Sequence, residues 1–232
     1  MPHISGTIKP YIDKTIATAM DKDFTEDPVL GPGFSQLHST LSSLVSRDGH
    51  VLQRVLFETL KESPYLSVWH ETDFAVSPEA DRLAEASSFE SCLETDLPYG
   101  KTTSRTINLD LVVLDHRTKV VTAFEVKRGK GYMGAGVRRQ TTRDILCARM
   151  LIKGYAQSLG FDVKKGDAKV IIYYGNRALP PSIGLTGSEL DEHFGVPVTT
   201  AVRESNAYFQ SQLDDILPGM LADCLNDSLP QT

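Results

Sequence analysis

Two acidic residues and a lysine occupy neighbouring apolar segments of this 232-residue sequence. Asp110 lies within INLDLVVLD, and Glu125 and Lys127 lie within VVTAFEVK. Two carboxylates held close together inside apolar strands repel each other and are costly to remove from water. A bound divalent cation removes this cost because it favours both ionised carboxylates. The pattern therefore indicates a candidate metal site.

The triplet of an acidic residue, any residue and a lysine is weak by itself. It occurs three times, beginning at Glu125, Asp162 and Asp167, where chance predicts about 1.6 occurrences. The triplets at Asp162 and Asp167 flank a turn that contains Gly166, and we interpret them as surface charge. Only Glu125 lies within a predicted strand that follows another strand bearing a carboxylate.

The geometry of the predicted hairpin decides whether the carboxylates meet. The two strands are joined by residues 116–119, and the simplest register closes symmetrically about that loop. The residues expected to face each other are Leu114 and Val121, Val112 and Ala123, and Asp110 and Glu125. Opposed side chains share a sheet face, with Cβ atoms about 4.5–5.5 Å apart. A slip of one residue would place the carboxylates on opposite faces, leaving a partly solvated charge cluster.

Hydrophobic periodicity and turn residues predict the elements that position this hairpin. We expect helices near 12–20, 37–45, 50–62, 137–159 and 188–194 and from about 201, and strands at 66–76, 107–115, 120–127, 168–174 and 196–199. A break is expected at Arg47-Asp48-Gly49, and a glycine-rich loop at 129–136. From residue 50 the order is helix, strand, strand, strand, helix, strand. This order predicts an α/β fold with a mixed β-sheet flanked by helices.

The length suits one domain with additions to its core. We expect an N-terminal arm and helix over 1–49, a core over 50–175 and a C-terminal helical extension of the same domain over 176–232. The acidic segment near 77–104 is interpreted as an insertion that contains a short helix.

Asp110, followed after fourteen residues by Glu125-Val126-Lys127 on the next strand, resembles the signature of the PD-(D/E)XK nucleases. The element order over about 50–175 is similar to their restriction-endonuclease-like core. Leu109 stands where the signature has its proline. The resemblance implies a Mg²⁺-dependent nuclease, with Mn²⁺ as a substitute, that hydrolyses phosphodiester bonds of DNA in restriction, repair or mobile-element processing.

The resemblance also implies roles for individual residues. Asp110, Glu125 and the backbone carbonyl of Val126 correspond to metal ligands. Lys127 corresponds to the residue that orients or activates the attacking water and steadies charge on the phosphate. Members often add a glutamate from the first core helix, and Glu58 is our candidate because it lies at the edge of that helix's apolar stripe. The alternative for Glu58 is a solvated helix residue.

Charge is distributed unevenly along the chain, whose net charge is −6. Residues 1–100 carry 16 acidic and 7 basic side chains, whereas residues 127–153 carry 8 basic side chains and one acidic one. The residues predicted to contact nucleic acid are Lys130, Arg138, Arg139, Gln140 and Arg143. Several of them fall in the first turns of a helix, whose N–H groups also favour phosphate. A solvated helix face is the alternative, and the acidic region could reflect a partner or a homodimer surface.

Other classes of function find little support. No apolar run approaches the roughly 18–20 residues that span a bilayer, and the N-terminus lacks a signal-peptide core, so we expect a cytoplasmic protein. Three cysteines without a C-x-x-C spacing argue against a disulfide framework or a zinc site. Two alternatives to an active nuclease remain: a nucleic-acid-binding module without turnover, and a structural or interaction domain with incidental hairpin charges.

Overall fold

The computed structural model describes residues 6–21, 24–100, 102–129 and 133–228, and these form two compact units. The first, the helical unit, is drawn from Met1–Leu56 and Val198–Thr232, and the second, the sheet unit, is Phe57–Pro197. These limits differ from the predicted ones, and the predicted packing of the two terminal regions on the core remains a prediction. Among the described helices, none is long and apolar enough to cross a membrane.

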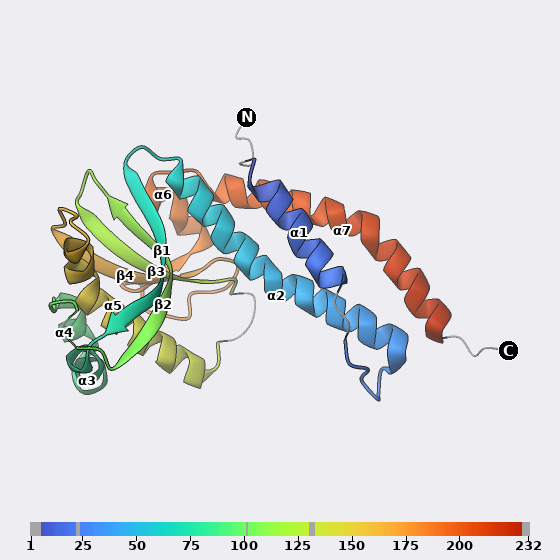
Figure 1. Ribbon diagram of the computed structural model, residues 1–232, viewed down its shortest axis with the longest axis horizontal. Coiled ribbons are helices and arrows are strands. Elements are labelled where there is room, and N and C mark those ends of the chain that lie inside the picture. Colours follow the sequence, from blue (N-terminus) through green and yellow to red (C-terminus); the bar gives the residue numbers. More distant parts are fainter. Residues whose placement is uncertain (1–5, 22–23, 101, 130–132, 229–232) are drawn as a thin grey trace. The chain divides into compact units, whose positions relative to one another are not determined.

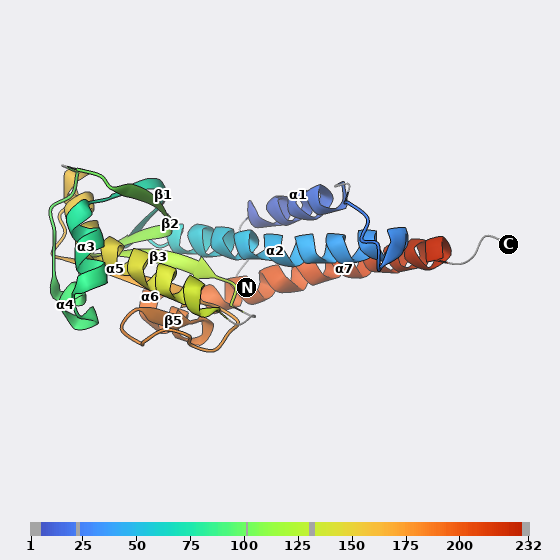
Figure 2. The same ribbon diagram turned by 90° about the horizontal axis from the view of Figure 1, so that it is seen from below.

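The helical unit contains α1 (Ile8–Met20), α7 (Val198–Ser228) and α2 (Gly31–Lys61) up to Leu56, the last residues of α2 belonging to the sheet unit (Figures 1 and 2). Helix α1 buries Ile8, Ile12 and Ile16 at helical spacing. The hydroxyl of Tyr208 on α7 donates to the carboxylate of Asp13 on α1 at 2.8 Å, which ties two ends of the sequence together.

Two predictions for these helices are wrong. The break expected at Arg47-Asp48-Gly49 does not occur, because α2 continues through it and buries Leu44 and Val51 on either side. One glycine costs a helix only about 1 kcal/mol, and this burial outweighs it. The strand expected at 196–199 is the start of α7 instead. Val198 and Val202 are both buried on that helix, so packing overrides the preference of β-branched residues for strands.

The sheet unit is built on a five-stranded mixed sheet in the order β1-β2-β3-β4-β5. The strands are β1 (Leu66–Val76), β2 (Arg105–Asp115), β3 (Val120–Lys127), β4 (Lys165–Ile172) and β5 (Gly184–Thr186). The first three strands are antiparallel to their neighbours, and β3, β4 and β5 are parallel. Helix α5 (Ala135–Ser158) connects β3 to β4 (Figure 1). The mixed sheet and its element order confirm the prediction, although β5 was not expected.

Successive side chains of a strand point to opposite faces of the sheet, and different helices cover the two faces. Val112, Ala123 and Val170 face α5 and share a buried cluster with its apolar residues. Phe124 points to the other face, where its ring contacts His193 and Phe194 of the short helix α6 (Leu190–Phe194). A 3₁₀ turn, η1 (Gly187–Glu189), precedes α6 and confirms the helix expected near 188–194.

The insertion after β1 contains two helices, α3 (Pro78–Ala86) and α4 (Phe89–Glu94), where one short helix was expected. Both have serine N-caps: Ser77 accepts from the Ala80 N–H and Ser88 from the Ser91 N–H. Figure 2 shows α3 and α4 beside α5. The insertion is therefore an ordered part of the sheet unit.

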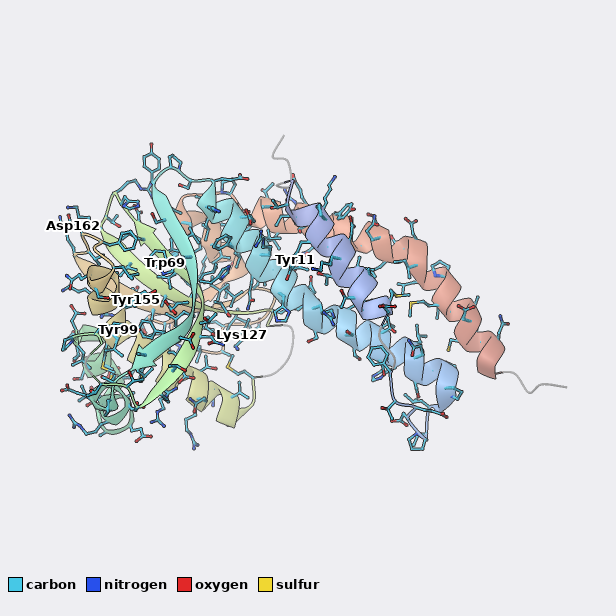
Figure 3. The ribbon with its side chains drawn as sticks, in the orientation of Figure 1. Tyr11, Trp69, Tyr99, Lys127, Tyr155 and Asp162 are labelled. Carbon is cyan, nitrogen blue, oxygen red and sulfur yellow. The ribbon has the colours of Figure 1, made fainter. Side chains whose placement is uncertain are left out.

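An aromatic group supports β1 where its pairing with β2 is irregular, between Trp69 and Phe74. The indole N–H of Trp69 donates to the hydroxyl of Tyr155 at 3.2 Å, and that hydroxyl donates to Glu71. Burial, followed by the hydrogen bond to Glu71, raises the pKa of Tyr155 to about 12. Tyr99 packs on Tyr155, and Figure 3 shows this group apart from Lys127. Its polar atoms are satisfied, which indicates a structural role.

Candidate functional site

The hairpin of β2 and β3 has the predicted register over its paired residues. Leu114 lies opposite Val121, and Val112 lies opposite Ala123. The paired segment ends at Leu111 and Phe124, so Asp110 and Glu125 are the next residues on each strand, just where the ladder stops. They are not a backbone pair.

Beyond the last backbone pair, the side chain of Asp110 connects β2 to β3. The backbone N–H of Val126 donates to the Oδ2 atom of Asp110 at 2.7 Å. In an extended strand the N–H and C=O of one residue point to the same side, so the carbonyl of Val126 is directed toward the β2 side of β3. The carbonyl of Lys127 points the other way and accepts from the N–H of Tyr173 at 3.1 Å. The Val126 oxygen is therefore directed to the side of β3 on which Asp110 lies.

Asp110 and Glu125 line one cavity of about 390 Å³ on the α5 side of the sheet. The other polar side chains that line it include Arg105 from β2 and Thr141 and Asp144 from α5. Asp144 was not predicted as a site residue. Its only sequence signal was its position as the single acid in the basic segment 127–153.

The electrostatics of Glu125 differ from those of an ordinary surface glutamate. Burial, followed by the negative charge of Asp110, raises the pKa of Glu125, and Asp144 acts in the same direction. The Nζ atom of Lys127 lies 2.5 Å from Oε1 of Glu125 and opposes this shift. The Glu125 side chain is 27% exposed and that of Lys127 is 38% exposed, so both are reachable from solvent.

Glu58 lies on the last turns of α2 and is partly buried. Its neighbour Phe57 stacks on His70 of β1 at 4.4 Å between ring centroids. His70 in turn contacts the backbone carbonyl of Asp110 through Nδ1. This chain of contacts brings the end of α2 to the strand that carries Asp110. Glu58 itself does not line the cavity, and its role as a further ligand remains a prediction.

The residues predicted to bind nucleic acid divide into two groups. Arg138 and Arg139 are exposed on the first turns of α5 and, within the described part of the chain, have no ion pair. Gln140 donates to the carboxylate of Asp144 at 2.9 Å. Arg143 is held by two carboxylates of α3. Lys130 lies outside the described residues.

Acidic residues of the insertion bind basic residues of α5 and β2, and we call this set the insertion clamp. Asp81 lies 3.1 Å from both Arg105 and Arg143, Glu85 lies 2.6 Å from Arg143, and Asp96 lies 2.9 Å from Arg149 and 2.8 Å from Lys153. Burial acts to raise the pKa of Asp81, but hydrogen bonds from Ser104 and Arg105 and the charges of both arginines outweigh it and lower that pKa. Part of the basic segment therefore serves the fold.

Within the described residues, no group of three histidine, cysteine, aspartate or glutamate side chains is arranged to hold a metal ion. Asp110 and Glu125 form a pair of carboxylates, and a third oxygen would come from the Val126 backbone. All three cysteines are buried, and none forms a disulfide bond within the described part of the chain. A comparison with protein-family models, curated proteins and solved structures finds no match to this chain.

Proposed function

We propose that the chain is a divalent-metal-dependent nuclease of the PD-(D/E)XK kind that hydrolyses phosphodiester bonds of DNA. The observation that carries this proposal is the convergence of Asp110 and Glu125 on one cavity, from adjacent antiparallel strands, with Lys127 paired to Glu125. The mixed sheet, with α5 between β3 and β4, supports a restriction-endonuclease-like core because its order of helices and strands is similar to that core. A cytoplasmic location and a homodimer remain predictions.

The donor set fits a hard divalent cation such as Mg²⁺ or Mn²⁺. Two carboxylates and a backbone carbonyl are oxygen ligands of the kind these ions prefer. The raised pKa of Glu125 indicates that Lys127 only partly compensates the charge of this carboxylate, which is buried beside that of Asp110. Asp110, Glu125 and the Val126 carbonyl would hold the ion, with Glu58 as a candidate fourth ligand. Bound there, the ion would polarise a phosphate oxygen and lower the pKa of a water molecule.

The remaining chemistry falls to side chains of this chain. Lys127 shares a sheet face with Glu125, so its ammonium can hold a water molecule or a phosphate oxygen at the cavity. It would stabilise negative charge as that charge develops on phosphate oxygens. Arg138 and Arg139 are the unpaired cations of α5 in the described chain, and they would bind the sugar–phosphate backbone.

Cleavage assays with matched variants test the proposal. Purified protein is incubated with single-stranded, duplex and branched DNA in Mg²⁺ and in Mn²⁺. We expect cleavage by the wild type and its loss in Asp110→Ala. The control is Asp162→Ala, which changes a second acid-x-lysine triplet at a carboxylate that is 76% exposed, and it should cut normally.

Thermal unfolding separates metal binding from catalysis. Mn²⁺ should raise the melting temperature of the wild type and of Asp162→Ala but not of Asp110→Ala, because a ligand that binds only the folded state stabilises it. If the wild type cuts no substrate while still binding DNA, the module without turnover is the better description. If it neither cuts nor binds DNA and Mn²⁺ leaves its melting temperature unchanged, the hairpin charges are incidental.

A further inference from the structure

A second hollow lies on the sheet unit beside the cavity that Asp110 and Glu125 line, which we call the catalytic cavity. It has a volume of about 890 Å³ and runs between the insertion helices, the first turns of α5 and the segment 178–180. Its apolar lining includes Ala84, Phe89, Leu146, Ala178, Leu179 and Pro180. We call it the insertion groove. Ligand sites are commonly hollows of this kind, with apolar and aromatic side chains and a few charged groups in the lining.

The insertion groove carries positive charge that no carboxylate of the described residues neutralises. Arg138 and Arg139 line it, and within the described residues neither has an ion-pair partner. Arg143 and Glu85 also line it but neutralise each other at 2.6 Å. The available charge is therefore that of two guanidinium groups at the rim of an apolar surface, which suits a ligand that is both anionic and partly apolar.

These features select among ligands that carry phosphate. A DNA duplex presents phosphates outside and keeps its bases stacked within, so it offers nothing to an apolar groove with an aromatic ring. An unpaired strand exposes both phosphates and base faces, and it is bound by cationic grooves that contain aromatic side chains. We propose that the insertion groove binds an unpaired stretch of DNA, with bases against Phe89 and its apolar neighbours and phosphates on Arg138 and Arg139.

The groove adjoins the proposed site of cleavage. That its ligand is DNA rests on the proposed function. Thr141, Asp144 and Ile145 line the catalytic cavity, whereas Thr142 and Leu146 line the groove. The two hollows thus lie on neighbouring faces of one helix, whose diameter is about 10–12 Å. Polar contacts join them as well: Gln140 at the groove donates to Asp144 at the cavity. The substrate class is therefore DNA with an unpaired flank beside the phosphate that is cut.

Binding without metal tests the groove independently of cleavage. Fluorescence anisotropy in EDTA compares an oligothymidylate strand, an abasic strand of the same length and a blunt duplex. The wild type should bind oligothymidylate more tightly than the other two. Phe89→Leu keeps an apolar side chain but removes the aromatic face, so it should weaken oligothymidylate binding about five- to tenfold and leave the abasic strand unaffected. Arg138→Gln with Arg139→Gln should weaken both strands and flatten the salt dependence.

Two matched controls guard against effects on folding. Phe161→Leu makes the same change in another partly buried ring that packs on the same core, outside the groove, and should bind like the wild type. Ala84→Asp places a carboxylate in the groove, whereas Ala86→Asp places it outside on the same helix. Only Ala84→Asp should weaken strand binding, and this pair decides the matter if Phe89→Leu fails to fold.

The results separate the groove from the nuclease. Equal affinity for duplex and oligothymidylate, or equal losses in Phe89→Leu and Phe161→Leu, would overturn the groove while leaving cleavage to be judged by Asp110→Ala. Strand binding that depends on Phe89 in a protein that never cuts would uphold the groove and overturn the nuclease.

Discussion

The insertion clamp and the hairpin site use the same carboxylate chemistry in opposite ways. In the clamp, Asp81 contacts Arg105 and Arg143, and Asp96 contacts Arg149 and Lys153. Burial acts to raise the pKa of Asp96, but the hydrogen bonds from Lys153 and Arg149 outweigh it and lower that pKa, as for Asp81. At the hairpin, burial and the Asp110 charge raise the pKa of Glu125, and only Lys127 compensates.

The charges of the clamp carboxylates stabilise the folded protein, whereas the charge of Glu125 destabilises it. Asp81 and Asp96 of the clamp each contact two cations, so their ionised forms favour the folded state. The ionised form of Glu125 disfavours it, because this carboxylate is partly removed from water and faces the negative charge of Asp110. An arrangement that lowers stability points to another requirement, and a bound cation is the one that we propose.

The largest expected effect concerns Lys127. Lys127→Ala should lower the rate of DNA cleavage about 10²–10³-fold, as when one donor to a transition state is lost. Stabilisation by Mn²⁺ should survive because Asp110 and Glu125 remain. The matched control is Lys164→Ala, in the acid-x-lysine triplet that begins at Asp162. Equal cleavage rates in the two variants would place catalysis elsewhere.

A smaller effect is expected from breaking the clamp. Asp81 is 13% exposed and is shared by two arginines, so Asp81→Asn should lower the free energy of unfolding by about 2 kcal/mol at neutral pH. Asp162→Asn removes a carboxylate that is 76% exposed and should leave the free energy of unfolding nearly unchanged. Denaturant titration of both variants measures the difference.

The stability that Asp81 contributes should also depend on pH. Because the pKa of Asp81 is lowered in the folded protein, its ionised form contributes stability that is fully present above the unfolded pKa of about 3.9. That contribution is lost as the pH falls through the lower, folded pKa. The gap between wild type and Asp81→Asn should therefore be constant from neutral pH to about pH 4 and close in stronger acid. A gap that widens below pH 4 would contradict it.

The hairpin was predictable from the sequence, whereas the clamp was not. Alternation of apolar residues and a symmetric loop determine the pairing of Val112 with Ala123, and both are local features. The partners of the clamp, such as Asp81 and Arg143, are 62 residues apart and meet only through the packing of α3 on α5. Charge counts showed an acidic and a basic region but could not show that they bind each other. For the same reason Asp144 was missed.

The smallest effect has the opposite sign from that of the clamp. Glu125→Gln removes a carboxylate that is buried near Asp110 and Asp144 in this cavity, and it keeps the size of the side chain. Without metal at neutral pH, this variant should be about 1 kcal/mol more stable than the wild type, a figure reduced by the lost contact with Lys127. Mn²⁺ should reverse the order, because the wild type gains stability from the ion and the variant gains little. Denaturant titration in EDTA and in Mn²⁺ measures both states. A variant that is less stable than the wild type in EDTA would mean that the Lys127 pair dominates, and the contrast between the hairpin site and the clamp would then fail.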